Sequence, residues 1–310
     1  MPYTCLLYTS NILHHQGLKV DISRQDAKDA IMPRFYGSTD KPKEIFGTDT
    51  PEHEAFLQAC ATQAPGADEL LQDLLQSWQP YTLKHSWVLP DNFHAHIKVM
   101  ETITDDRIEV DELNHTRFVY HYKINQGKEK GLSNAANVVH SIDAYILRTM
   151  IRRCNYNLNQ VRMLNVWITE ELLARSIGEW SHDPIVLTDD LRIHVDLYNR
   201  TGMVDTVILD YLSSDLLIGL SDKHLKDLNK VLTQMLMHKP FPLVTVHDAF
   251  GAHVNNLNRV RYWYKEILAE LAESTILDSI FTDIYGESMK YQKLSNDLSK
   301  YIRNSNYAIN

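Results

Sequence analysis

A short apolar run that ends in His-Asp is the first pattern in this chain that could do chemistry. Residues 243–246 are Leu-Val-Thr-Val, and Ala-Phe-Gly at 249–251 follows the pair His247 and Asp248. This order predicts two short strands joined by a tight turn, with the Asp248 carboxylate at its tip. A carboxylate held in this way can bind a divalent cation. A two-metal site for phosphoryl transfer needs at least one more carboxylate, which must converge on Asp248.

A second group of residues with chemical potential lies far upstream. Arg24, Lys28, Met32 and Tyr36 follow one another at intervals of four, and Gly37 comes next. Residues four apart share one face of a helix. The fork of donors on arginine and the point charge of lysine suit phosphate groups, and the tyrosine offers a flat ring and a hydroxyl to a sugar. A solvated basic stripe is the alternative, and the spacing alone leaves both open.

Local signals predict the elements that must hold these residues. Ser23 and Asp26 form a capping-box pattern at the start of a helix over 21–36, and Gly37 is typical of a helix end. Pro33 should kink the last turn of that helix. Further helices are predicted at 52–63, 67–79, 134–154, 167–179 and 222–237, strands at 85–89, 93–100, 184–188 and 203–209, and a loop at 38–51.

Composition sets the class of protein. The 310 residues are 44% hydrophobic and 23% charged, which is typical of a globular chain with a substantial core. There is no run of 18 apolar residues, and the three scattered cysteines suit a reducing compartment. The formal net charge of −9 is unfavourable for holding nucleic acid by charge alone, so a local basic surface or a partner would have to supply the phosphate contacts.

Four motifs resemble those of the single-subunit, phage T7-like RNA polymerases, and they occur in the family's order. Residues 24–38 resemble motif B, and 247–251 resemble motif C. Residues 136–143, which contain His-Ser-Ile-Asp, resemble the family's helix with His-Ser-x-Asp. Residues 87–93 resemble the Trp-x-x-Pro-Asp-Gly-Phe turn that precedes it. The related DNA polymerases usually carry Phe at the position of Met32 and His-Asp-Glu in motif C, so both details favour RNA synthesis.

The resemblance implies a fold and its division. The chain would be of the α/β (α+β) class, with the fingers and palm portions of a right-hand polymerase fold, rich in helix and with an antiparallel palm hairpin. Residues 1–137 would form the fingers portion around the motif B helix at 21–37. Residues 138–310 would form the palm portion with the motif C hairpin at 243–254, and about 155–238 would be an insertion relative to the family.

The resemblance also implies roles for single residues. Asp248 would bind both Mg²⁺ ions of a two-metal site, and Lys28 would stabilise charge on the leaving pyrophosphate. Tyr36 would close over the sugar and favour ribose, with His140 close to the 2′-hydroxyl. The NTP-binding set would comprise Arg24, Lys28, Met32, Tyr36, Gly37 and His140, with His247, Gly251 and Asp143 in support.

One departure from the family predicts a partner. Motif A, which carries the second metal-binding Asp, should precede motif B, but motif B begins here at residue 24. A second polymerase subunit would then carry motif A and the N-terminal part of the fold, as in the heterodimeric RNA polymerase of N4-like phages. The other implied partners are the DNA template, the nascent RNA and NTPs, without a membrane, in the cytoplasm of a bacterial host during phage infection.

Two alternative functions would also use these residues. His247 and Asp248 with His94 and His96 could be the metal ligands of an HD-type phosphohydrolase, although the pair would then lie on a helix. The chain could also be a polymerase-like subunit that only binds nucleic acid or a partner.

Charged residues outside the motifs have their own interpretations. Arg148, Arg152 and Arg153 could contact template phosphates or form a solvated basic face. Asp210 and Asp215 match no motif and are interpreted as surface or cap residues.

Overall fold

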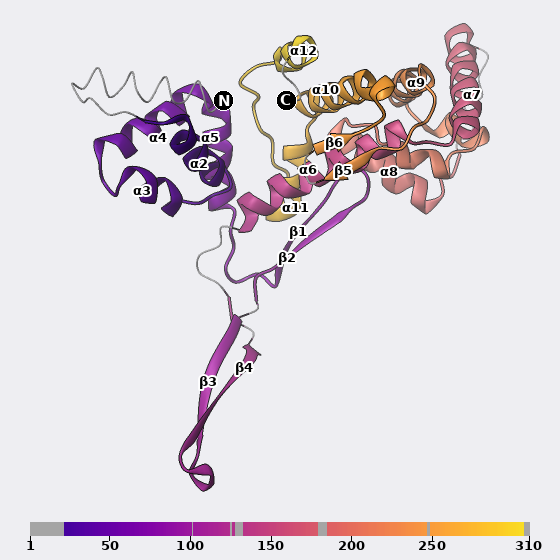
Figure 1. Ribbon diagram of the computed structural model, residues 1–310. Coiled ribbons are helices and arrows are strands. Elements are labelled where there is room, and N and C mark those ends of the chain that lie inside the picture. Colours follow the sequence, from indigo (N-terminus) through magenta and orange to yellow (C-terminus); the bar gives the residue numbers. More distant parts are fainter. Residues whose placement is uncertain are drawn as a thin grey trace. The chain divides into compact units, whose positions relative to one another are not determined.

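Residues 22–100, 102–124, 126–127, 133–178, 185–246 and 249–306 are described by a computed structural model (Figure 1). They divide into two units. The first holds the residues through Ser86 and His96–His140, and the second holds Trp87–Ala95 and the residues from Ser141 onward. Both are rich in helix, and the strands of the described residues pair in small two-stranded antiparallel sheets.

The first unit opens with helices that pack on a small core. They are α2 (Arg24–Phe35), α3 (Asp40–Phe46), α4 (Pro51–Gln63) and α5 (Pro65–Gln76). Thr50 caps α4, because its hydroxyl accepts from the His53 N–H at 3.3 Å. The core consists of Ala30, Ile31, Phe56, Ala59 and Cys60.

Helix α3 corrects the prediction of a loop over 38–51. Its Ile45 and Phe46 pack against the core of the unit, and Asp40 stands in its first turn. Packing of these two partly buried side chains therefore stabilises a helix that the local Gly, Pro and Ser content obscures.

Two strands follow, β1 (Lys84–Val88) and β2 (His94–Lys98), and they pair with each other. The turn between them contains Asn92 at a φ of 60°, a left-handed conformation that asparagine tolerates well. The Asn92 N–H donates to the Leu89 carbonyl at 2.9 Å. The predicted strands and turn are confirmed within one or two residues.

A long hairpin is formed by β3 (Thr102–Val110) and β4 (Thr116–Ile124), joined at its tip by the 3₁₀ turn η1 (Asp111–Leu113) (Figure 1). Alternation divides it into two faces. Ile108 opposes Phe118 on one face, which also carries Tyr120 and Tyr122. The other face carries cross-strand polar contacts: Asp105 contacts the ring of His121, and Glu109 forms an ion pair with Arg117. Most of these side chains are exposed.

The second unit is built around a larger core. Helix α6 (Ser133–Cys154) enters it from the first unit and is followed by α7 (Leu158–Ile177), α8 (Asp189–Thr201), η2 (Thr206–Tyr211), η3 (Asp215–Gly219) and α9 (Asp222–Leu236). Strands β5 (Val244–Val246) and β6 (Ala249–Gly251) precede η4 (Val254–Asn256), α10 (Leu257–Glu273), α11 (Ile276–Tyr285) and α12 (Leu298–Asn304). Helix α7 packs along α9, and the core includes Leu164, Ile168, Leu228, Leu232 and Trp263.

The predicted strands near 184–188 and 203–209 are wrong for the described residues. Residues 185–188 have no regular structure, and 206–211 form η2. The Asp205 carboxylate accepts from the Val207 N–H at 2.9 Å, which caps a helical turn in place of a strand. Helix α7 also begins earlier than predicted, because Asn157 caps it through the N–H groups of Asn159 and Gln160. Among the helices of the described residues, none has the length and apolar character to cross a membrane.

Candidate nucleotide-binding site

Helix α2 begins at a well-formed cap. The Asp26 N–H donates to the Ser23 hydroxyl at 3.1 Å, and the Ser23 N–H donates to the Asp26 carboxylate at 3.3 Å. This is the capping box that the sequence predicts. Ala27, Ala30 and Ile31 are buried on one side of the helix. The cap and this buried side fix which face points outward.

The outward face of α2 carries the predicted stripe. Arg24, Lys28 and Met32 are all exposed. Tyr36 lies eight positions beyond Lys28, which at 1.5 Å per residue is roughly 12 Å along the helix axis. The stripe therefore offers two cations along an open surface that ends at an aromatic ring.

The end of α2 explains why a glycine stands at 37. The Ser38 N–H donates to the Pro33 carbonyl at 2.9 Å, and the Gly37 N–H donates to the Arg34 carbonyl at 2.8 Å. Gly37 has a φ of 93°, so these bonds form a Schellman cap with glycine in the left-handed position. Pro33 lies inside the last turn, as the sequence indicates. The cap sets the direction in which Tyr36 leaves the helix.

Tyr36 meets His140, a residue far away in the sequence. The two rings stack with their centroids 4.8 Å apart and an angle of 17° between their planes. Tyr36 is half-buried and His140, on α6, is exposed. Both rings were predicted to lie beside the sugar of a bound nucleotide. The contact therefore joins the end of α2 to α6.

The turn at 87–93 packs onto α6 within the second unit. The Trp87 indole N–H donates to the Ser141 hydroxyl at 3.0 Å, and Trp87 is fully buried. Asp91 accepts from the Arg148 Nε at 2.6 Å, and the Arg148 guanidinium lies 4.4 Å from the centre of the Phe93 ring. Two of the sequence segments that resemble family motifs, 87–93 and 136–143, thus contact each other directly.

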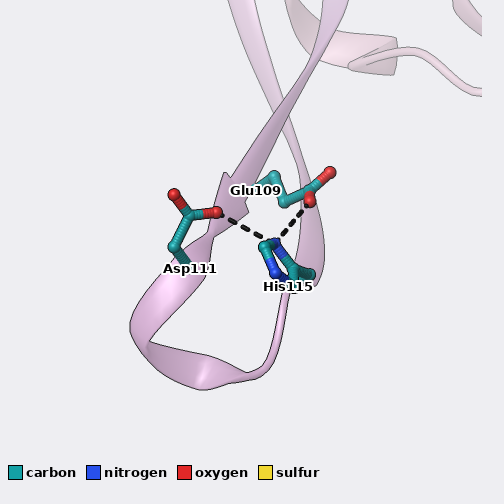
Figure 2. A group of neighbouring side chains, drawn as sticks. All are labelled: Glu109, Asp111 and His115. Carbon is teal, nitrogen blue, oxygen red and sulfur yellow. Dashed lines mark hydrogen bonds and ion pairs between the residues drawn. The ribbon is translucent and has the colours of Figure 1, made fainter.

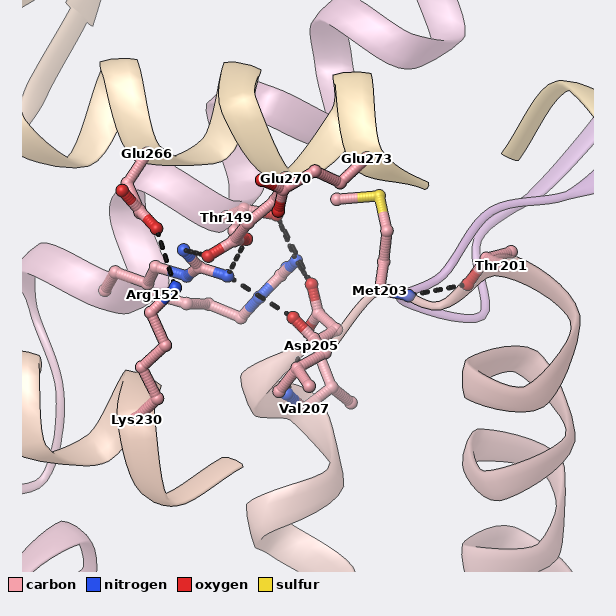
Figure 3. A network of polar contacts seen from close by, with 12 residues as sticks. Thr149, Arg152, Thr201, Met203, Asp205, Val207, Lys230, Glu266, Glu270 and Glu273 are labelled. Atoms are coloured by element: carbon pink, nitrogen blue, oxygen red, sulfur yellow. Dashed lines mark hydrogen bonds and ion pairs between the residues drawn. The ribbon is translucent and has the colours of Figure 1, made fainter. Parts of the chain in front are cut away.

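The arginines of α6 make ion pairs, which corrects one prediction. Arg153 is fully buried and binds both oxygens of the Glu270 carboxylate, at 2.9 and 2.6 Å. Arg152 donates to Asp205 at 2.7 Å, a contact drawn in Figure 3. Arg153 can therefore neither contact a template phosphate nor belong to a solvated face. Its partner lies on α10, and burial without that partner would be very unfavourable.

Acidic and basic side chains continue this network toward the C-terminus. Glu266 binds Lys230 at 3.1 Å and Arg303 at 2.9 Å. Burial raises the pKa of Glu266, but these two hydrogen-bonded cations outweigh burial and bring the pKa below its ordinary value. Arg303 also binds Glu273, so it fastens α12 to α10. The contacts of Arg152 with Asp205 and of Lys230 with Glu266, drawn in Figure 3, therefore hold helices of the second unit together.

The two strands predicted around His247 and Asp248 are present. Val246 of β5 pairs with Ala249 of β6, and Val244 pairs with Gly251. This confirms the predicted strands, over a shorter span than 243–254. The Phe250 ring packs 5.7 Å from the Tyr264 ring, which seats one side of the hairpin on the core. His247 and Asp248 lie outside the described residues.

Two of the three supporting residues, Asp143 and Gly251, lie among the described residues. Asp143 is exposed on α6, one turn beyond His140. A Cβ atom at Gly251 would lie 3.7 Å from the Val244 carbonyl oxygen, which is a normal contact. Packing therefore does not require glycine at 251, and its assignment as a supporting residue stays a prediction. Asp210 and Asp215 are exposed, in line with their interpretation as surface or cap residues.

A group of metal-type ligands that the sequence analysis missed lies at the tip of the β3–β4 hairpin. The His115 Nδ1 lies 3.0 Å from a Glu109 oxygen and 3.1 Å from an Asp111 oxygen (Figure 2). All three side chains are exposed, and Arg117 already neutralises Glu109 at 2.8 Å. In the sequence, the only indication of this group is a His four residues after an Asp. We interpret the group as polar contacts that close the tip. The predicted Mg²⁺ site at Asp248 stays a prediction.

No protein-family model matches this sequence, and a comparison with curated proteins finds no match.

Proposed function

We propose that this chain is one subunit of a DNA-dependent RNA polymerase that transfers nucleotides by a two-metal mechanism. The observation that carries the proposal is the stack between Tyr36 and His140. The resemblance assigns both residues to one nucleotide site, and the chain brings them into ring contact. The contact between Trp87 and Ser141 gives further support, because it joins two other motifs of the same family.

The proposed reaction is attack by the RNA 3′-hydroxyl on the α-phosphate of an incoming NTP, with pyrophosphate as the leaving group. Arg24 and Lys28 would bind the triphosphate along α2, where both are exposed to an incoming ligand. Lys28 would neutralise charge that develops on the leaving group. Tyr36 and His140 would contact the ribose. Asp248 would hold Mg²⁺ ions together with a motif A Asp from a second subunit.

The main rival is a metal-dependent phosphohydrolase of the HD type. In such an enzyme the His-Asp pair lies on a helix, whereas strands β5 and β6 flank His247 and Asp248 here. A non-catalytic, polymerase-like subunit is the other candidate. The exposed cations on α2 suit phosphate binding in both cases, so the Asp248→Ala comparison below distinguishes the two.

The decisive assay measures NTP incorporation on an RNA-primed DNA template with Mg²⁺. It compares the chain alone, the chain with the polypeptide that co-purifies from its native source, and the same complex carrying Asp248→Ala. Asp210→Ala is the matched control, since Asp210 is an exposed carboxylate outside the motifs. We expect incorporation only by the complex, its loss with Asp248→Ala, and no change with Asp210→Ala. An active complex that tolerates Asp248→Ala would refute a catalytic role for this chain.

A further inference from the structure

Helix α7 carries a row of exposed apolar side chains. Met163 is 44% exposed, Val166 is 52% exposed, and Leu173 and Ile177 are each 60% exposed. With Glu170 they follow one another at steps of three, four, three and four residues. We call these five residues the α7 stripe. Such spacing is the a and d pattern by which one helix packs along another.

The opposite side of α7 is already used. Val161, Leu164 and Ile168 are buried in the core of the second unit, where α7 packs along α9. The helix is thus apolar on two sides, one covered and one open. A helix with apolar side chains all round is normally buried in its complete assembly. The open side therefore indicates a missing neighbour with helical geometry.

Charge identifies the kind of neighbour. Within the described residues Glu170 makes no ion pair, although it lies in the middle of the stripe. Burying its carboxylate requires a cation on the helix that covers it. A second copy of α7 in parallel register would place Glu170 against Glu170. In antiparallel registers it would face Val166 or Leu173, so self-pairing gives the carboxylate no cation directly opposite.

We infer that the α7 stripe docks a helix of the second polymerase subunit, with apolar a and d residues and a Lys or Arg opposite Glu170. The inference rests on the proposed function, since that function supplies the partner. It assigns a role to part of the segment at about 155–238 that the single-subunit family lacks. That segment would hold the two chains of the split enzyme together.

The first test measures binding between this full chain and the co-purifying polypeptide, after co-expression of both. Leu173→Glu should raise Kd roughly ten- to hundredfold, the loss expected for one buried leucine. Met237→Glu is the matched control, because Met237 is 61% exposed on the same unit but lies off the stripe. It should leave Kd within about twofold. Both positions are exposed, so equal melting curves will show that each variant folds.

A charge exchange tests the predicted cation. A photo-crosslinker in place of Leu173 identifies the partner helix and its Lys or Arg nearest to Glu170. Glu170→Lys should weaken binding, and replacement of that partner cation by Glu should restore it. Stripe variants that bind with unchanged Kd would overturn the inference, as would a chain that purifies without a stoichiometric partner. A dimer of twice the 35.9 kDa chain mass, lost with Leu173→Glu, would assign the stripe to self-association instead.

The NTP assay separates this inference from the proposed function. A complex that depends on Leu173 but incorporates no NTP would leave the docking surface standing and refute the polymerase assignment. An active complex whose Kd is insensitive to Leu173→Glu would keep the polymerase and refute the docking surface.

Discussion

Burial of His224 should make the stability of the chain depend on pH in a defined window. His224 is 2% exposed in α9, and its ring stacks on Tyr198 with centroids 3.7 Å apart and planes 7° apart. Burial lowers the pKa of the imidazole from 6.5 to about 4. In the unfolded chain the imidazole takes up a proton below about pH 6.5, whereas in the folded chain it stays neutral down to about pH 4.

The sign and size follow from this difference in pKa. Because the unfolded state binds the extra proton, the free energy of unfolding falls as pH falls from about 6.5 to 4. A difference of about 2.5 pKa units at 1.36 kcal/mol each corresponds to a loss of about 3 kcal/mol. His224→Phe keeps an aromatic ring against Tyr198 and removes the proton. Between pH 6.5 and 4, the free energy of unfolding of the variant should therefore fall by about 3 kcal/mol less than that of the wild type.

Urea unfolding at pH 7.5 and pH 4, followed by tryptophan fluorescence, measures this effect. Comparing the two proteins at each pH cancels the titration of the other groups. His253→Asn is the control, since His253 is exposed and asparagine can keep its cap on η4. Equal pH dependence in wild type and His224→Phe would show that the imidazole is not held neutral by burial.

Three further predictions concern other contacts. Arg153→Ala should lower the free energy of unfolding, measured by thermal unfolding, by about 3 kcal/mol or more, because it leaves the Glu270 carboxylate without its cation. The double variant with Glu270→Leu should recover part of that loss. Tyr36→Phe keeps the ring for stacking and removes the hydroxyl, so preference for NTP over dNTP should fall roughly two- to tenfold in competitive incorporation. Gly37 has a φ of 93°, so Gly37→Ala should lower the free energy of unfolding by about 1 kcal/mol and should also lower NTP incorporation. Gly286→Ala, at a φ of 75°, is the control and should shift the melting temperature by a similar amount with normal NTP incorporation.

Sequence patterns correctly predicted the helix ends and turns that depend on residues close together in the chain. The capping box of Ser23 and Asp26 and the glycine at 37 mark the ends of α2, and both take the expected geometry. The residues around Asn92 mark a turn between two strands in the same way. In each case the donor and the acceptor are only a few residues apart, so a short stretch of sequence is enough to predict the hydrogen bond.

Contacts between distant residues could not be predicted in this way. Arg153 looked like a surface residue because its partner, Glu270, is far along the chain. Helix α3 depends on the core that receives Phe46, and the run at 203–209 bends at Asp205 because a carboxylate caps it. No spacing rule relates Tyr36 to a histidine of α6, so the sequence could not predict their ring contact.

The exposure of the β3–β4 hairpin on both of its faces has a consequence for how the sequence can change over time. Its strands are held by their own ladder and by cross-strand pairs such as Asp105 with His121. Replacing exposed side chains such as Phe118 or Tyr122 therefore costs the folded core little. Selection can then vary these positions freely, so related chains should differ more in this hairpin than in α6 or α10.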